Sequence, residues 1–124
     1  MLNTATLGGF VATQNAAEAR KFYEEVLGLT FVGDEPYALV FDANGTSLRV
    51  QKVYEVVKVP YTVLGWHVSD IESVVAQLTE KGVEFMRVPG FDQDDLGIVT
   101  FPGGARVAWF TDPDGNTLSL DQIE

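Results

Sequence analysis

The sequence predicts an α+β domain made of two βαβββ units in tandem. Three observations support this fold class: two amphipathic helical segments that each follow an extended segment, a glycine at the end of each helix, and two hairpin turns. Corresponding residues of the two halves also keep a constant spacing, which indicates an internal repeat.

The first unit begins with an expected strand over residues 5–13 and a helix that starts after Asn15. Asn15 is a favourable N-cap, and Glu18 three positions later completes a capping-box pattern. Gly28 marks the end of the helix. The helix has an apolar face with helical spacing, formed by Ala19, Phe22, Tyr23, Val26 and Leu27.

Three strands complete this unit, and we expect them near residues 30–32, 36–42 and 46–53. The dipeptide Asn44-Gly45 lies between the last two. It favours a two-residue hairpin, so these two strands are expected to pair.

The second unit repeats this order. We expect a strand over 61–68, a helix that begins at a capping box of Ser69 and Glu72 and ends at Gly82, and a short strand over 83–88.

A loop follows at residues 89–104, rich in Gly, Pro and Asp, with a brief strand expected at 98–101. Long loops in small domains often carry function, and we expect this loop to gate a binding site. An apolar run and the turn Asp-Pro-Asp-Gly-Asn at 112–116 then predict the closing hairpin.

Subtraction of residue numbers supports the repeat. Asn15 and Ser69 are 54 positions apart, and the glycines that end the two helices have the same separation. Between the hairpins the separation grows to 70, as from Asp42 to Asp112. The difference of sixteen residues corresponds to the long loop of the second unit.

Two βαβββ units, the sequence Phe22-Tyr23 followed by Leu27-Gly28-Leu29, and the closing Asp-Pro-Asp-Gly-Asn hairpin resemble the vicinal oxygen chelate superfamily. This group contains glyoxalases, bleomycin-resistance proteins and extradiol dioxygenases. The resemblance implies one domain over residues 1–124, with a first module of about 5–58 and a second of about 61–122. It also implies a cup-shaped mixed sheet and a homodimer.

In metal-dependent members of this family, His, Glu or Gln side chains on the first and last strands of each module hold a divalent metal. The positions of this chain that match are Gly8, Arg49, Val63 (or Thr62 if the register shifts by one) and Ser119. Three of these side chains cannot coordinate a metal and a serine hydroxyl is a weak ligand, while a guanidinium repels a cation. We therefore expect a member that lacks the metal ligands and needs no cofactor.

Strand alternation places a set of side chains on the same face as these positions, and they are the candidates for ligand binding. Trp109 or Phe110 is expected to add an aromatic wall, with the other residue in the core. The candidate ligand-binding residues are Phe10, Arg49, Gln51, His67, Trp109, Ser119 and Asp121.

Arg49 and His67 are the two catalytic candidates. Arg49 can clamp an anionic oxygen, and its alternative role is an ion pair with Asp121 or Glu124. His67 is the single histidine and can serve as a general base, or it can simply form a hydrogen bond at a strand end.

Composition limits the partners. The net charge of −10 argues against nucleic acid and anionic membranes, since both bind through basic side chains. The chain has no cysteine and no apolar run of membrane-spanning length, so a cytoplasmic location is expected.

The leading hypothesis is a glyoxalase-like protein without the family metal site that binds a small organic molecule in the cup. The first alternative is a lyase or isomerase that uses Arg49 and His67 in place of metal. The second is an interaction module whose cup is vestigial.

Overall fold

A computed structural model describes residues 1–123 of the chain. The chain divides into two compact units, Met1–Lys58 and Val59–Glu124, and each contains one four-stranded mixed sheet. The order of elements in each unit is βαβββ, which confirms the predicted α+β fold class. Among the described residues, no helix combines the length and apolar character needed to cross a membrane.

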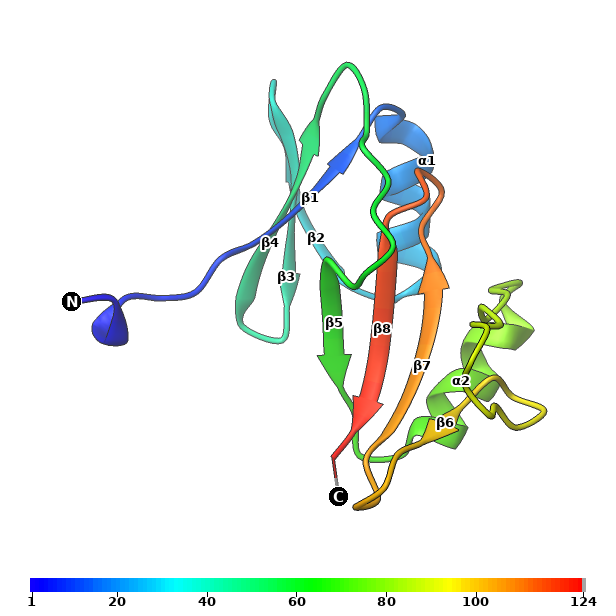
Figure 1. The fold of residues 1–124 in the computed structure, drawn as a ribbon. Helices are drawn as coiled ribbons and strands as arrows, with labels where there is room; N and C mark the ends of the chain where they lie inside the picture. The colour runs from blue at the N-terminus through cyan, green and yellow to red at the C-terminus, as the bar shows by residue number, and fades with distance from the viewer. Residues whose placement is uncertain (124) are drawn as a thin grey trace. The chain divides into compact units, whose positions relative to one another are not determined.

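In the first unit a 3-10 turn at Leu2–Thr4 precedes the strands and helix. These elements are β1 (Gly9–Thr13), α1 (Ala16–Lys21) with a π-helical turn over Phe22–Val26, β2 (Thr30–Asp34), β3 (Ala38–Ala43) and β4 (Thr46–Lys52). The sheet order is β1-β4-β3-β2, in which β1 is parallel to β4 and the other pairs are antiparallel (Figure 1).

The local signals of the first unit act as predicted. The Asn15 side chain accepts a hydrogen bond from the Glu18 amide at 3.2 Å, which caps α1. Asn44 and Gly45 have φ of 53° and 91°, so the hairpin between β3 and β4 uses the expected left-handed turn. Tyr23, which follows α1, is fully buried and contacts the ring of Phe41 on β3.

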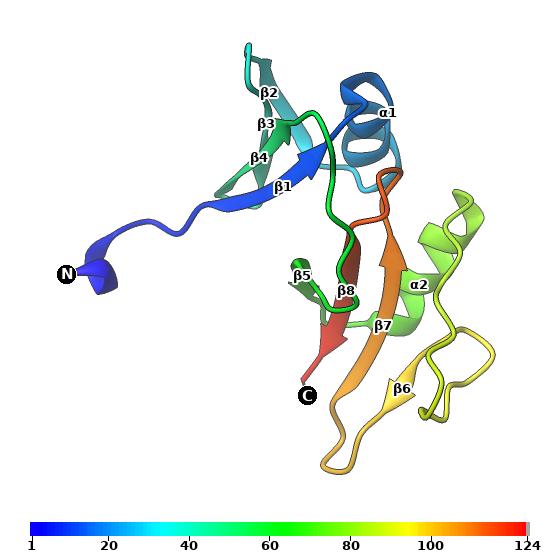
Figure 2. The same ribbon diagram turned by 45° about the horizontal axis from the view of Figure 1, so that its top comes forward.

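The second unit contains β5 (Leu64–His67), α2 (Ile71–Glu80), β6 (Val99–Thr100), β7 (Arg106–Thr111) and β8 (Thr117–Gln122). Its sheet order is β5-β8-β7-β6, with β5 parallel to β8. The helix α2 packs against β7 and β8 (Figure 2). The brief strand expected at 98–101 is therefore present as β6.

The start of α2 differs from the prediction by one residue. Asp70 is the N-cap instead of Ser69, and its carboxylate accepts from the Ser73 amide at 3.2 Å. The side-chain oxygen of Gln122, at the end of β8, accepts from the amide of Ile71 at 2.8 Å. A residue 51 positions away thus helps to place the first turn, which local sequence does not reveal.

The strand predicted over 83–88 is wrong. Only the Met86 amide bonds to β7 there, through the Trp109 carbonyl at 2.8 Å. The Gln93 side chain bonds to both neighbouring backbone groups: its Nε2 donates to the Met86 carbonyl and its Oε1 accepts from the Val88 amide. One side chain therefore satisfies backbone groups that a strand partner would otherwise use, and the short β6 pairs with β7 instead.

The closing turn is built around a buried carboxylate. Asp112 is 5% exposed, and its Oδ1 accepts from the backbone amides of Asp114 and Asn116, both at 3.0 Å. Its Oδ2 accepts from the side-chain amide of Asn116 at 2.8 Å. This arrangement sets the register with which β7 meets β8.

Burial alternates along β4 of the first sheet as expected, whereas on β8 of the second sheet Thr117, Leu118, Ser119 and Leu120 are all buried. In the first, Leu48 and Val50 of β4 are buried against the α1 side, and Arg49 lies on the opposite face. In the second, Leu118 and Leu120 of β8 are buried on the α2 side. We call the face of each sheet away from its helix the open face.

Candidate functional site

Three predicted site residues share the open face of the first sheet. Phe10 of β1 is the register partner of Arg49 on β4, and Gln51 lies two residues further along β4. Phe10 is 55% exposed, and Gln51 is also exposed. An apolar ring therefore lies beside a cation and an amide on one accessible surface.

Arg49 has a carboxylate partner, but not the one expected. Its Nη2 donates to Glu35 Oε1 at 2.8 Å, and the two side chains are 36% and 52% exposed. Glu35 lies between β2 and β3, so the pair forms within the first unit. Asp121 bonds to His67 instead, and Glu124 lies outside the described residues.

On the second sheet, His67 and Asp121 are register partners at the ends of β5 and β8. The His67 Nδ1 lies 2.5 Å from Asp121 Oδ1. The His67 side chain is 84% exposed and that of Asp121 is 25% exposed. The carboxylate orients an imidazole whose Nε2 is accessible to solvent.

Trp109 and Ser119 are register partners on β7 and β8. Trp109 is half-buried, whereas its neighbour Phe110 is fully buried on the α2 side, so Trp109 is the aromatic residue on the open face. Ser119 is 8% exposed and is the register partner of Gly65 on the neighbouring strand β5. A Cβ at Gly65 would lie 2.7 Å from Ser119 Oγ, so the glycine permits this close approach.

A cavity of about 230 Å³ lies at Trp109. Its lining is mainly apolar: Pro60, Tyr61, Met86, Val88, Pro89 and Trp109. Arg87 and Thr117 complete the wall, and the Thr117 hydroxyl donates to the Val59 carbonyl at 3.1 Å. The cavity is therefore suited to an apolar or aromatic group more than to an ion.

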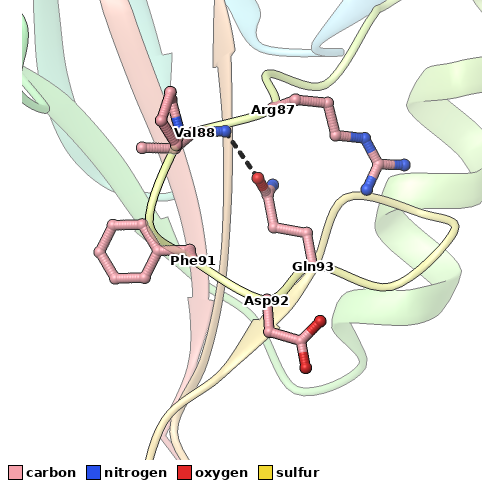
Figure 3. A pocket seen from close by; sticks show the side chains of 6 residues that line it. Arg87, Val88, Phe91, Asp92 and Gln93 are labelled. Atoms are coloured by element: carbon pink, nitrogen blue, oxygen red, sulfur yellow. Dashed lines mark hydrogen bonds between the residues drawn. The ribbon is translucent and has the colours of Figure 1, made fainter.

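An adjoining depression of about 370 Å³ shares Arg87, Val88 and Pro89 with the first cavity. Figure 3 shows Phe91 on one side of its backbone segment and the Arg87 side chain on the other. The terminal nitrogens of Arg87 donate to the Asp94 and Asp95 carbonyls at 2.6 and 3.0 Å. Arg87 thus holds the loop together.

Sequence reasoning identified Trp109 but missed most of the residues around it. Tyr61 and Met86 belong to strands expected over 61–68 and 83–88, of which the structure keeps only Leu64–His67. Pro89 and Phe91 lie in the loop, where alternation gives no guide to orientation. The available signal was an aromatic residue, Phe91, in a loop otherwise rich in Gly, Pro and Asp.

The side chains at the family's metal positions do not fit a divalent metal. Gly8 directly precedes β1, Val63 directly precedes β5, and Arg49 and Ser119 lie on β4 and β8. Ser119 supplies one neutral oxygen, and Arg49 supplies a cation. Within residues 1–123, no group of three or more His, Cys, Asp or Glu is arranged to hold a metal ion.

The similarity of the chain to known proteins agrees with its fold. The family model described as "Glyoxalase/Bleomycin resistance protein/Dioxygenase superfamily" matches residues 4–120. A search of the curated proteins found no match.

Among solved structures, the chain is similar to lactoylglutathione lyase from Agrobacterium tumefaciens, with 13% identity, a TM-score of 0.73 and coverage of 96% of this chain and 93% of that one. It is similar to a superfamily member from Sphaerobacter thermophilus DSM 20745, with 22% identity, a TM-score of 0.75 and coverage of 98% and 99%. It is also similar to TnmS3, an antibiotic-binding protein from Streptomyces sp. CB03234, with 24% identity, a TM-score of 0.70 and coverage of 100% and 99%.

Proposed function

Because the chain belongs to the glyoxalase, bleomycin resistance protein and dioxygenase superfamily, we propose that it binds a small organic molecule without a metal. The binding surface we propose is the open face of the second sheet at Trp109. The observation that carries the proposal is the apolar cavity at this residue. The similarity in fold to an antibiotic-binding protein is consistent with such a role.

The chemistry of the cavity defines the kind of ligand. The indole of Trp109, the ring of Tyr61 and two prolines offer flat apolar surfaces, and flat surfaces favour planar partners. The Thr117 hydroxyl already donates to a carbonyl, so its oxygen remains as an acceptor. We therefore propose a ligand with a planar aromatic group and few charged substituents on that group.

The two tryptophans of the chain lie on opposite faces of the second sheet, which permits a direct binding test. In a Trp66→Phe protein, Trp109 is the single indole emitter. We expect quinoline, 2-naphthoate or 9-aminoacridine, which are planar probes of different charge, to change this emission in a saturable way.

The matched control is Trp109→Phe, which leaves the half-buried Trp66 on the α2 side as the emitter. Its emission should not saturate with the same probes after correction for absorption. If no probe gives a saturable change in the Trp66→Phe protein, or in the same protein with Phe91→Ala to remove the ring that contacts Trp109, the proposal of small-molecule binding at Trp109 is wrong. Such a result would favour the interaction-module alternative.

The contact between His67 and Asp121 favours a second candidate function, a lyase or isomerase. In the tautomer that carries its proton on Nδ1, His67 donates to Asp121, and Nε2 is then available as a base. Arg49 would serve as the group that polarises an oxygen, in competition with its bond to Glu35.

Assay of lactoylglutathione formation with metal-depleted protein tests this candidate, because one structure of similar fold is a lactoylglutathione lyase. Loss of turnover in both Arg49→Ala and His67→Ala, with unchanged circular dichroism, would support it. Equal rates in the original protein and both variants would exclude catalysis by these two residues.

The proposal includes a homodimer. Several large apolar side chains of the described residues are exposed, among them Phe10 at 55%, Tyr37 at 81% and Val63 at 40%. A partner surface would remove such side chains from water. Light scattering coupled to size-exclusion chromatography tests the dimer independently of ligand.

A further inference from the structure

Phe91 lies against the tryptophan that we propose as the binding surface. The ring centroids of Phe91 and Trp109 are 5.5 Å apart and the ring planes make an angle of 40°. Phe91 lines the larger depression and Trp109 lines the adjoining cavity. The phenyl ring thus covers part of the indole that a planar ligand would use.

The contact is a tilted one, without the parallel offset stacking that gives rings their greatest overlap. Phe91 remains 42% exposed, so the core does not hold it in place. It also meets Phe101 at a centroid distance of 5.6 Å and an angle of 78°. A ligand that stacks flat on the indole can therefore replace a weaker intramolecular contact.

The segment that carries Phe91 is short and lightly held. We call residues 89–92 the Phe91 flap; all four are exposed. A single backbone-to-backbone hydrogen bond involves these four residues, from the Phe91 amide to the Val88 carbonyl at 3.3 Å. Gly90, next to Phe91, has φ of +92°, a conformation that a glycine adopts without strain.

Both ends of the Phe91 flap are fixed. The Gln93 side-chain oxygen accepts from the Val88 amide at 2.6 Å (Figure 3). Its side-chain nitrogen donates to the Met86 and Gly97 carbonyls, both at 2.8 Å. Beyond it, the Asp94 carboxylate accepts from the Leu96 and Ile98 amides. Ile98 and Val99 are 2% and 4% exposed, so the rest of the loop is anchored.

We propose that Phe91 is an intramolecular plug that competes with a planar aromatic ligand for Trp109. This inference rests on the proposed function and names the ligand class and the residue that limits its affinity. The moving part is the Phe91 flap, not the whole loop 89–104. A ligand must displace the phenyl ring from the indole before it can stack there.

Fluorescence titration of Trp109 in the Trp66→Phe background tests the plug with the same three probes. Removal of the ring in Phe91→Ala eliminates the competitor, so the affinity should rise by about 2- to 10-fold, the range of one aromatic pair. Without ligand, the emission of Trp109 should shift to longer wavelength because more of the indole meets water.

Phe101→Ala is the matched control, because it removes the other ring that contacts Phe91 and leaves the contact with Trp109. Its affinity and emission should stay close to those of the background protein. If Phe91→Ala does not fold, as judged by circular dichroism, Phe91→Leu removes the aromatic ring with less loss of volume and should give the same direction of change.

The outcomes separate the two proposals. Binding that weakens or stays unchanged in Phe91→Ala, while the background protein binds a probe, overturns the plug and leaves the function intact. Absence of a saturable change in both proteins with every probe overturns both. Equal gains in Phe91→Ala and Phe101→Ala would also overturn the plug, since a general loosening of the loop would explain them.

Discussion

Arg49 donates to Glu35 across 2.8 Å on the open face of the first sheet, at a position where metal-dependent relatives would need a Lewis base. The Arg49 guanidinium is therefore paired with a carboxylate of the protein itself, and needs no ligand to balance its charge. Both side chains are more than a third exposed, so solvent screens their attraction. An incoming anion can compete for Arg49 at low cost.

A double-mutant cycle with Arg49→Ala and Glu35→Ala should give a coupling free energy of about 1 kcal/mol or less, because exposed ion pairs rarely exceed this value. Urea unfolding of the four proteins measures it. The coupling should fall further when the ionic strength is raised. A coupling several times larger and insensitive to salt would show that the pair is a structural element unavailable to ligand.

The aspartates at the start of the two hairpin turns, Asp42 and Asp112, allow a comparison of how much each turn contributes to stability. Asp112→Ala should lower the free energy of unfolding by about 2–3 kcal/mol, because buried amides lose a charged acceptor. Asp42 occupies the equivalent position 70 residues earlier, is exposed, and accepts one bond from the Gly45 amide at 3.4 Å. Asp42→Ala should therefore cost less than about 1 kcal/mol.

Thermal or urea unfolding of both variants measures the contrast. Equal losses would contradict the view that burial of Asp112 makes the second turn the more important one. A loss confined to Asp42→Ala would contradict it more strongly.

A second stability contrast concerns two glycines in strands. Gly65→Ala places a Cβ 2.7 Å from Ser119 Oγ and 3.3 Å from the Ser119 carbonyl oxygen, so the serine hydroxyl must move away and β8 must give slightly. We expect a loss of about 1–3 kcal/mol, the usual cost of overpacking. Gly33→Ala is the control, because a Cβ there meets no atom within 4 Å and its φ is ordinary.

Adding Ser119→Gly to Gly65→Ala removes the closest atom and should restore part of the lost stability relative to Ser119→Gly alone. Chemical unfolding of the single and double variants provides the comparison. Similar stabilities for Gly65→Ala and Gly33→Ala would show that the strands accommodate the methyl group freely.

Most of the fold could be predicted from the sequence, because each element expected in one unit can be checked against its counterpart in the other. The caps, helix-ending glycines and hairpins recur at fixed spacing, and Gly28 and Gly82 both have the positive φ expected of them, 76° and 96°. Errors arose where distant side chains decide local structure. Gln122 helps to place the start of α2 and Gln93 replaces a strand partner, and both contacts depend on tertiary structure.

The candidate site was predictable to a smaller extent. Strand alternation placed Arg49 on the open face of the first sheet, but it left open whether Trp109 or Phe110 lies on the open face of the second. The cavity beside Trp109 depends on Tyr61, Met86 and Pro89, which lie outside strands, and Phe91 of the adjoining depression contacts the indole. Loop conformation has no such periodicity, so these residues appear as neighbours of Trp109 only in the structure.

Calorimetric titration with the tightest of the three planar probes tests the central claim most directly. The claim predicts equal affinities before and after exhaustive chelation, and a weakening of about tenfold or more in Trp109→Ala, as expected when an aromatic anchor is removed. Glu80→Ala, which changes an exposed residue at the end of α2, should bind as the original protein does. Binding that requires an added divalent metal, or that is unchanged in Trp109→Ala, would contradict the claim.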